Sequence, residues 1–258
     1  MNANDFAHRI RSREKLVGYW VTLDVPPAAE RIARLGYDYV VLDGQHGLIG
    51  YQGLMTGLLA IDAGSAIGPR PTVGMVRVEA NDPTPIGRAL DAGATGVIVP
   101  LVDSADDVAR AVRAAKYPPT GARSFGPMRA ALRIGPVPAD SNDATVVLAM
   151  IETPLGLRNV AEICATPGLD GVYVGPSDLS LALGARFPGD PEVEGPFEEA
   201  VELIARTARE AGIAAGIHTF DGDSAKKRLD QGYTYATVAS DLSHLEAIAA
   251  AHLDTARS

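Results

Sequence analysis

The chain of 258 residues has 23 basic and 32 acidic side chains, a net charge of −9 at pH 7 and a hydrophobic content of 47%. The negative charge and an aromatic content of only 5% disfavour a nucleic-acid-binding surface, because phosphate backbones are bound by clustered basic side chains. No apolar run approaches the roughly 18 residues of a transmembrane helix, so the sequence predicts no membrane span.

The N-terminus and the cysteine content predict a cytoplasmic protein. The stretch MNANDFAHRIRSREK is polar and lacks the apolar core of a secretory signal. Cys164 is the single cysteine and cannot form an intrachain disulfide, so a small buried side chain is its simplest interpretation. We therefore expect a cytoplasmic protein whose partner is a small molecule, without nucleic-acid or membrane binding.

Strands and helices are predicted to alternate along the first half of the chain. The strands are expected at 18–23, 38–42, 72–78 and 96–99, and the helices that follow them at 28–35, 51–63, 84–92 and 104–116. Residues 117–144 break this rhythm with several Pro and Gly residues. So long an irregular connection inside a compact domain predicts a lid or binding loop.

The second half of the chain continues the alternation. Strands are expected at 146–151, 171–174, 213–217 and 233–238, and helices at 153–166, up to 211, at 221–230 and at 241–255. Thr153 is the predicted N-cap of its helix and Pro154 the first helical residue. Eight strand–helix units without a compositional boundary predict an α/β fold, a single (β/α)8 TIM barrel over 1–258. An open, doubly wound sheet is the alternative.

Two carboxylates follow neighbouring strands. Glu152 comes directly after 146–151, and Asp178 follows 171–174 across a Gly-Pro break. The intervening helix makes the two strands parallel, so their carboxyl ends meet at one edge of the sheet. Paired carboxylates there favour a hard divalent cation such as Mg²⁺ or Mn²⁺. The simpler alternative is a pair of helix-capping acids that bind no metal.

Asp43 and His46 lie in a glycine-flanked loop after the second strand. Histidine exchanges protons near neutral pH, and a neighbouring carboxylate can fix its tautomer. We therefore predict His46 as a general acid/base with Asp43 as its partner, in preference to an ordinary surface histidine. His218 also follows a strand, but it has no acidic companion before Asp221 and is interpreted as a rim residue.

Arg77 lies near the end of the apolar third strand, where a buried guanidinium needs an anion. The anion is either Glu152 or Asp43, in a structural ion pair, or a carboxylate or enolate oxygen of the substrate, which we favour. Ser177 opens a helix whose free backbone N–H groups can hold a substrate carboxylate.

These groups together match the requirements for forming an enolate of a 2-oxo acid. A metal ion and an arginine would stabilise the developing oxyanion, while a histidine moves the proton. A Schiff-base mechanism would instead need a lysine at a strand end. The only lysines are Lys15, Lys116, Lys226 and Lys227, and none is so placed.

Five motifs in the same order resemble the HpcH/HpaI aldolase family of class II pyruvate aldolases. They are LDGQHG, MVRVEANDP, YPPTGARSFG, MIETPLGLRNV and GLDGVYVGPSDLSLALG, and the match runs from about Gly18 to Leu242. The resemblance implies a metal-dependent aldolase, a carbon–carbon lyase. Such an enzyme forms or cleaves 4-hydroxy-2-oxo acids through a pyruvate or hydroxypyruvate enolate and an aldehyde.

The resemblance also implies roles for the candidate residues. Glu152 and Asp178 would hold Mg²⁺, Mn²⁺ or Co²⁺, and Arg77 would stabilise the enolate. His46 with Asp43 would act as acid/base, and amides around Ser177 and Asp178 would hold the substrate carboxylate. The assembly implied is a homohexamer, a trimer of dimers, in which the helix at 241–255 is exchanged between subunits.

Two positions depart from the family pattern. Met150 stands where many members have Gln, and Gln45 where members often have Glu before the catalytic histidine. These differences leave the donor and acceptor preference open. Arg123, within 117–144, is placed either at the acceptor site or as an anchor of its loop to the barrel.

Two other functions are compatible with the same residues. One is a related lyase on the same enolate chemistry, an oxaloacetate decarboxylase or a citryl-CoA-type lyase. The CoA version is disfavoured because 117–144 has no evident basic patch for a CoA phosphate. The other is a barrel that binds a 2-oxo acid without turnover, against which the complete set of candidate catalytic residues argues.

Overall fold

The computed structural model describes residues 3–258, in which eight parallel strands form a closed barrel in the order β1 to β8. Met1 and Asn2, which begin the predicted 1–258 domain and its polar N-terminus, lie outside the described residues. The strands are β1 (Leu16–Val21), β2 (Tyr39–Asp43), β3 (Val73–Arg77), β4 (Gly96–Val99), β5 (Val146–Ile151), β6 (Gly171–Val174), β7 (Ala214–Thr219) and β8 (Tyr235–Ser240). Because β1 pairs with both β2 and β8, the predicted (β/α)8 TIM barrel is confirmed and the open-sheet alternative is wrong.

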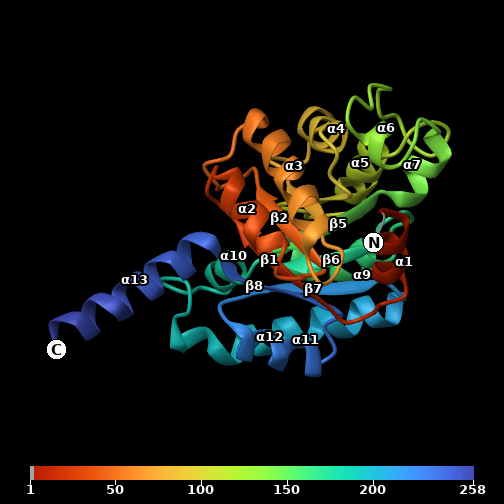
Figure 1. The fold of residues 1–258 in the computed structure, drawn as a ribbon. Helices are drawn as coiled ribbons and strands as arrows, with labels where there is room; N and C mark the ends of the chain where they lie inside the picture. Colours follow the sequence, from red (N-terminus) through yellow and green to blue (C-terminus); the bar gives the residue numbers. More distant parts are fainter. Residues whose placement is uncertain (1–2) are drawn as a thin grey trace.

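Helices surround the barrel (Figure 1). Those that follow the strands are α2 (Pro26–Ala33), α3 (Tyr51–Ile67), α4 (Pro83–Asp91), α5 (Ala105–Ala115), α8 (Pro154–Arg158), α9 (Val160–Cys164), α10 (Pro176–Ala182), α11 (Glu194–Ala211), α12 (Gly222–Asp230) and α13 (Asp241–Arg257). The additional elements are α1 (Ala3–Arg11), α6 (Ala130–Arg133), α7 (Pro138–Ala144) and the short 3₁₀ helix η1 (Pro191–Val193). Within residues 3–258, no helix combines the length and the apolar character needed to cross a bilayer.

Both faces of the strands are buried, because successive side chains point alternately into the barrel and outwards to the helices. Inward-facing Tyr39, Met75 and Leu148 belong to the core inside the barrel. Outward-facing Val76 and Val147 belong to the larger core under the helices. Runs without charge and rich in β-branched residues suit both the barrel interior and the layer under the helices. Such runs are visible in the sequence, so the predicted bounds of β4, β5 and β6 agree with the structure.

Helix α1 was not predicted, because the N-terminal stretch that contains it is polar overall. Phe6, Ala7 and Ile10 recur at helical spacing and are fully buried in the core inside the barrel. The Phe6 ring packs on that of Tyr39, with 6.0 Å between ring centroids. Because Tyr39 begins β2, α1 closes the N-terminal end of the barrel and leaves the other end open for a site.

The long connection at 117–144 is not a lid over its own barrel, which corrects the prediction. It joins the C-terminus of α5 to the start of β5, so it lies at the N-terminal end of the barrel. Arg123 donates from Nη2 to Asp91 Oδ1 at 2.5 Å, and its guanidinium lies 4.5 Å from the ring centroid of Tyr117. Arg123 therefore anchors the loop to the barrel, the second of its two predicted roles.

The helix predicted at 153–166 is divided into α8 and α9. Thr153 is the N-cap, as expected, and its Oγ1 accepts a hydrogen bond from Gly156 N at 2.9 Å. Asn159 interrupts the helix and donates from Nδ2 to Asp103 O at 2.8 Å. This side-chain bond ties the segment after Glu152 to the loop that follows β4.

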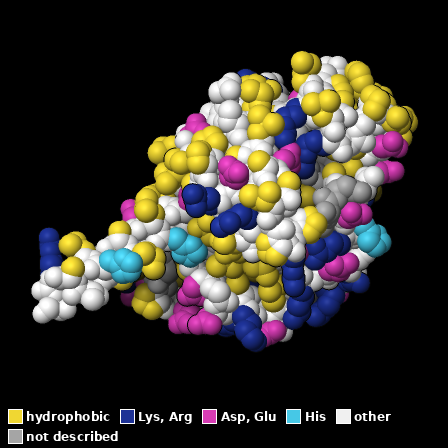
Figure 2. Space-filling view, viewed as in Figure 1, with side chains coloured by type: hydrophobic (Ala, Val, Ile, Leu, Met, Phe, Trp, Pro, Cys, Tyr) yellow, Lys and Arg dark blue, Asp and Glu magenta, His cyan; other side chains and the backbone are white. Residues whose placement is uncertain are grey.

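The C-terminal helix α13 is fixed to the barrel only at its start. Asp241 accepts hydrogen bonds from Thr22 N and Leu23 N, and Tyr19 Oη lies 2.9 Å from His244 Nδ1. Beyond this point the helix projects away from the barrel (Figure 1), and none of its 17 residues is buried. Figure 2 shows hydrophobic side chains along the projecting arm. The large hydrophobic residues Leu242, Leu245, Ile248 and Leu253 of α13 are all exposed.

Candidate active site

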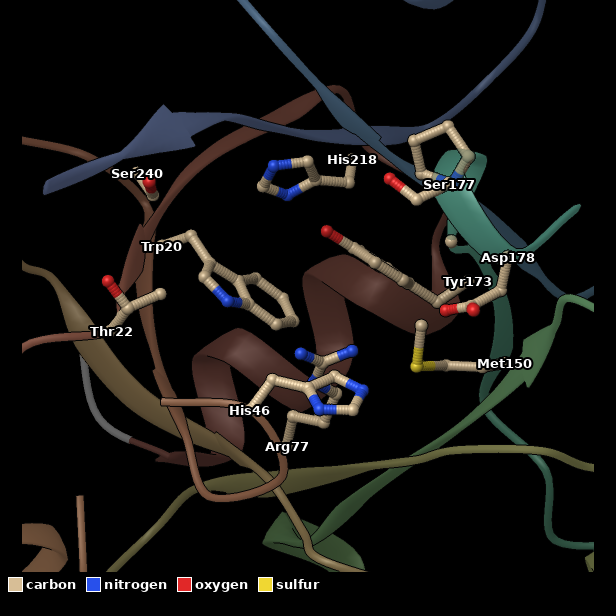
Figure 3. A pocket seen from close by; sticks show the side chains of 12 residues that line it. Trp20, Thr22, His46, Arg77, Met150, Tyr173, Ser177, Asp178, His218 and Ser240 are labelled. Atoms are coloured by element: carbon tan, nitrogen blue, oxygen red, sulfur yellow. The ribbon is translucent and has the colours of Figure 1, made fainter. Parts of the chain in front are cut away.

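A cavity of about 230 Å³ opens at the C-terminal ends of the strands, where a TIM barrel carries its chemistry. Figure 3 shows the side chains that converge on it from several strands and loops. It is lined by Trp20, Thr22, His46, Arg77, Met150, Tyr173, Gly175, Pro176, Ser177, Asp178, His218 and Ser240. Four of the predicted site residues therefore line one cavity, while Asp43 and Glu152 lie behind its wall.

Asp43 and Arg77 form a buried bidentate ion pair. They are direct register partners at the ends of β2 and β3, so the fold itself brings them together. Arg77 Nε donates to Asp43 Oδ1 at 2.8 Å and Nη2 to Oδ2 at 2.6 Å. Burial raises the pKa of Asp43, but the hydrogen bonds and charge of Arg77 outweigh it and lower that pKa overall. These bonds use Nε and Nη2, and the Arg77 side chain also lines the cavity.

Trp20 completes this ion-pair cluster. Its indole Nε1 donates to Asp43 Oδ2 at 3.2 Å, and the Arg77 guanidinium lies 4.9 Å from the centre of the indole ring. The ring thus holds the guanidinium from one side while Asp43 holds it from another. Three different strands fix the direction in which Arg77 points.

His46 is exposed in the loop after β2 and points into the cavity (Figure 3). The carboxylate of Asp43 accepts a hydrogen bond from the backbone N–H of His46 at 3.2 Å and from that of Gln45 at 3.0 Å. Asp43 therefore shapes the loop that carries His46. Within residues 3–258 it makes no hydrogen bond to the imidazole ring, so the structure does not bring these two groups together as predicted.

Glu152 is a buried carboxylate with one satisfied and one unsatisfied oxygen. Oε1 accepts a hydrogen bond from Leu101 N at 2.8 Å, whereas Oε2 has no hydrogen-bond partner among residues 3–258. Burial raises the pKa of Glu152 to about 7; the Leu101 bond and Arg77 oppose this shift, and the charge of Asp178 adds to it. Because the negative charge of Asp178 helps to raise the pKa of Glu152, the two predicted metal ligands interact electrostatically.

The backbone around Glu152 is adapted to this position. Leu101 has a φ of 53°, in the left-handed region that costs a non-glycine residue about 1–2 kcal/mol. This conformation aims its N–H at Glu152. On the other side, a Cβ atom at Gly175 would overlap Glu152 Oε2, so only glycine allows the carboxylate to approach the start of α10.

Asp178 and Ser177 lie in the first turn of α10, next to Glu152. Pro176 is the first helical residue, and the exposed carboxylate of Asp178 lines the cavity. Ser177 lines the same cavity and also its apolar neighbour, which continues beneath η1. The predicted helix start is therefore present at the cavity, although the helix is only 7 residues long.

The two carboxylates fit a divalent cation. The unsatisfied Glu152 Oε2 is an anionic ligand without a counterpart among residues 3–258, and Asp178 reaches the same cavity wall. In the same described range, no cluster of three or more His, Cys, Asp or Glu side chains is arranged as a metal site. Two protein carboxylates would leave the other coordination positions to water and substrate oxygens, an arrangement that suits Mg²⁺.

Several cavity residues were not predicted from the sequence. His218 lies inside β7, which extends beyond the predicted strand, and its ring packs edge-on against Trp20 with 5.3 Å between centroids. The Tyr173 ring stacks on Trp20, with 5.8 Å between centroids. Tyr173 pairs in register with Met150, and both point inwards. Strand alternation two residues back from Glu152 was the signal that could have identified Met150, whereas Tyr173 follows only from its register with Met150.

The comparisons with known proteins agree with this site. The model of the HpcH/HpaI aldolase/citrate lyase family matches residues 16–247. The chain is 40% identical to the hydroxypyruvate/pyruvate aldolase of Rhizorhabdus wittichii over 92% of both chains. It is 36% identical to the 4-hydroxy-2-oxo-heptane-1,7-dioate aldolase of Shigella flexneri, over 96% of this chain and 92% of that one.

A solved structure shows the same relationship in three dimensions. The crystal structure of a family protein from Burkholderia cenocepacia J2315 superposes with a TM-score of 0.90, at 33% identity, and covers 99% of this chain and 100% of that one. The family match spans the whole barrel, and the relatives are aligned over nearly their full length. The chain belongs to the HpcH/HpaI aldolase/citrate lyase family.

Proposed function

We propose that this chain is a divalent-metal-dependent aldolase that forms or cleaves 4-hydroxy-2-oxo acids through the enolate of pyruvate or hydroxypyruvate. The observation that carries the proposal is the unsatisfied, buried Glu152 carboxylate, which lies behind the wall of a cavity lined by Arg77 and Asp178. Metal dependence is typical of the family, and relatives aligned over most of the chain are named as aldolases of this kind.

Glu152 and Asp178 would hold Mg²⁺, Mn²⁺ or Co²⁺, which when bound supplies Lewis acidity at the 2-oxo group. Arg77, held by Asp43 and Trp20, would bring its positive charge to the enolate oxygen, where negative charge develops. The backbone N–H groups of Ser177 and Asp178 at the start of α10 hold the substrate carboxylate. In each of these roles the protein holds the side chain or the backbone N–H group in its working orientation before the substrate binds.

His46 is proposed to move the proton. In the cleavage direction it accepts the proton of the 4-hydroxyl group, the C3–C4 bond breaks, and its electron pair forms the enolate as the aldehyde leaves. A proton is then returned to C3 to give the 2-oxo acid. Asp43 serves this step by holding the backbone of the His46 loop, a positioning role that differs from the predicted contact with the imidazole ring.

Cleavage of a 4-hydroxy-2-oxo acid tests the proposal. Protein stripped of metal should release no pyruvate, and added Mg²⁺ or Mn²⁺ should restore the release, measured by coupling to a dehydrogenase. Oxaloacetate, offered in parallel, tests the related decarboxylase function. Full release of pyruvate in excess chelator would contradict the metal-dependent mechanism, and faster turnover of oxaloacetate would favour the alternative lyase.

We also propose that the protein is a homo-oligomer, a hexamer formed as a trimer of dimers, in which α13 packs on a neighbouring subunit. The helix leaves its own barrel with Leu242, Leu245 and Ile248 exposed on one side. A stripe of this kind normally faces a protein surface. Within the described part of the chain, no other helix follows β8 that could cover the outer face of β8 and β1.

Charges placed on this stripe should disrupt the assembly. Leu245→Glu combined with Ile248→Glu is expected to shift the protein from the hexamer to smaller species in multi-angle light scattering, since each buried carboxylate would lack a partner. Ala247→Glu with Ala251→Glu adds the same charge on another side of α13 and serves as the control. An unchanged hexamer in the stripe variant would show that α13 does not form the interface.

A cytoplasmic location is part of the proposal. Cys164 is buried and forms no disulfide. Burial raises the pKa of its thiol to about 12, so little thiolate is present at neutral pH. Cell fractionation with a cytoplasmic marker would test the location directly.

A further inference from the structure

We propose that His218 selects a substrate that carries a hydroxyl group on the reacting carbon or on the carbon next to it. The inference rests on the proposed aldolase function and deepens it by naming the substrate class. His218 lines the same cavity as Arg77 and Asp178, and in Figure 3 it lies across the cavity from His46 and Arg77. Its ring is therefore placed to contact the substrate from the side opposite the proposed proton-transfer group.

The hydrogen-bonding capacity of His218 is unused by the described residues. Neither ring nitrogen has a hydrogen-bond partner among residues 3–258, although the side chain is only partly exposed. The ring is held in place by aromatic contacts, edge-on to Trp20 at 5.3 Å and to Phe220 at 6.5 Å. A polar ring fixed in this way and left unsatisfied in a cavity is suited to a ligand group that both donates and accepts.

The ring is neutral at physiological pH. Burial, and then the positive charge of Arg77, lower its pKa to about 4, while Asp43 opposes the shift. A neutral imidazole offers one N–H donor and one acceptor nitrogen, which matches a hydroxyl group. It offers no charge to a carboxylate, and among residues 3–258 Arg77 is the only Lys or Arg side chain that lines the cavity. Within this cavity the chemistry thus favours a substrate with an additional hydroxyl group over one with a second carboxylate.

Two sources of the hydroxyl are chemically equivalent for His218. It is either the 3-hydroxyl of a hydroxypyruvate donor, carried by the carbon that forms the new bond, or the 2-hydroxyl of a hydroxyaldehyde acceptor, one carbon beyond that bond. Met150, which also lines the cavity, is apolar and cannot form a hydrogen bond of comparable strength with the hydroxyl. His218 is thus the group that distinguishes hydroxylated from non-hydroxylated substrates.

Initial rates with the metal-loaded oligomer separate these sources. One arm compares hydroxypyruvate with pyruvate as donors to acetaldehyde, and the other compares glycolaldehyde with acetaldehyde as acceptors of pyruvate. His218→Leu is expected to lower kcat/KM about tenfold more for the hydroxylated substrate than for the pyruvate–acetaldehyde pair, the effect of one lost hydrogen bond. His218→Asn, which keeps a donor and an acceptor, should recover part of the loss.

His8→Leu, the same change at an exposed histidine on α1, is the control and should leave all rates unchanged. A loss in the donor arm identifies hydroxypyruvate, and a loss in the acceptor arm identifies the hydroxyaldehyde. An equal loss with every substrate pair, or no loss in either arm, would overturn the proposal. If the unmodified protein gives no metal-dependent product even from pyruvate and acetaldehyde, the proposed function fails instead.

Discussion

Glu152→Gln is expected to abolish metal-dependent turnover, by about a thousandfold or more, and at the same time to stabilise the metal-free protein near pH 8 by about 1–3 kcal/mol. Turnover is lost because a neutral amide replaces the carboxylate proposed to hold the cation. Stability rises because the metal-free protein otherwise buries an ionised Glu152 whose Oε2 has no partner among residues 3–258. Chemical denaturation in chelator and the cleavage assay measure the two effects.

The pH dependence of this stability has a defined sign. The pKa of Glu152 is about 7 in the folded chain, against an ordinary value of 4.5 in the unfolded chain. Glu152 therefore keeps its proton to higher pH in the folded state than in the unfolded state. The resulting contribution to the free energy of unfolding is fully present below about pH 4.5 and is lost as the pH rises through 7. The Glu152→Gln variant should lack that loss, whereas Glu162→Gln, at an exposed site on α9, should behave like the unmodified protein. Equal pH profiles for the two variants would contradict this role of Glu152.

Arg77→Met is expected to lower turnover by about two to four orders of magnitude and to destabilise the protein by about 3–5 kcal/mol. The first effect follows from the loss of the positive charge proposed to face the enolate. The second arises because Asp43, which is 1% exposed, would keep its charge without its bidentate partner. Steady-state kinetics and urea unfolding measure the two effects separately.

A second substitution separates the two roles of Arg77. Combining Arg77→Met with Asp43→Asn removes the unpaired charge, so the double variant should recover much of the lost stability while turnover stays low. Recovery of turnover together with stability would mean that Arg77 acts only as the structural partner of Asp43, which was the other possibility raised by its position in the strand.

Much of the barrel could be predicted from the sequence because its strands are buried on both faces. The runs that form β4, β5 and β6 contain no charge and end at Gly, Pro or acidic residues, so their limits are visible. The first helix was missed because its apolar residues, Phe6 and Ile10, are spaced among charged ones. Its role depends on a contact with Tyr39, a residue far along the chain, which no local pattern reveals.

The candidate site was predictable where it follows strand ends and not where it depends on side-chain direction. Position alone made Glu152, Asp178, Arg77 and His46 candidates, and the last three line the cavity. The pairing of Arg77 with Asp43 follows from the register of β2 and β3, which the sequence does not specify. His218 was interpreted as a rim residue because it lacks a nearby acid in sequence, whereas its partner in space is the ring of Trp20.

Exchange of the methyl protons of pyruvate for deuterium, followed by NMR, isolates the enolate step because it needs no aldehyde. We predict exchange with Mg²⁺ or Mn²⁺, none in chelator, and none in the His46→Ala and Asp178→Ala variants under the same conditions. Hydroxypyruvate serves as a second donor in the same experiment. Exchange that persists undiminished in chelator, or its absence from folded, metal-loaded protein with both donors, would contradict the enolate mechanism.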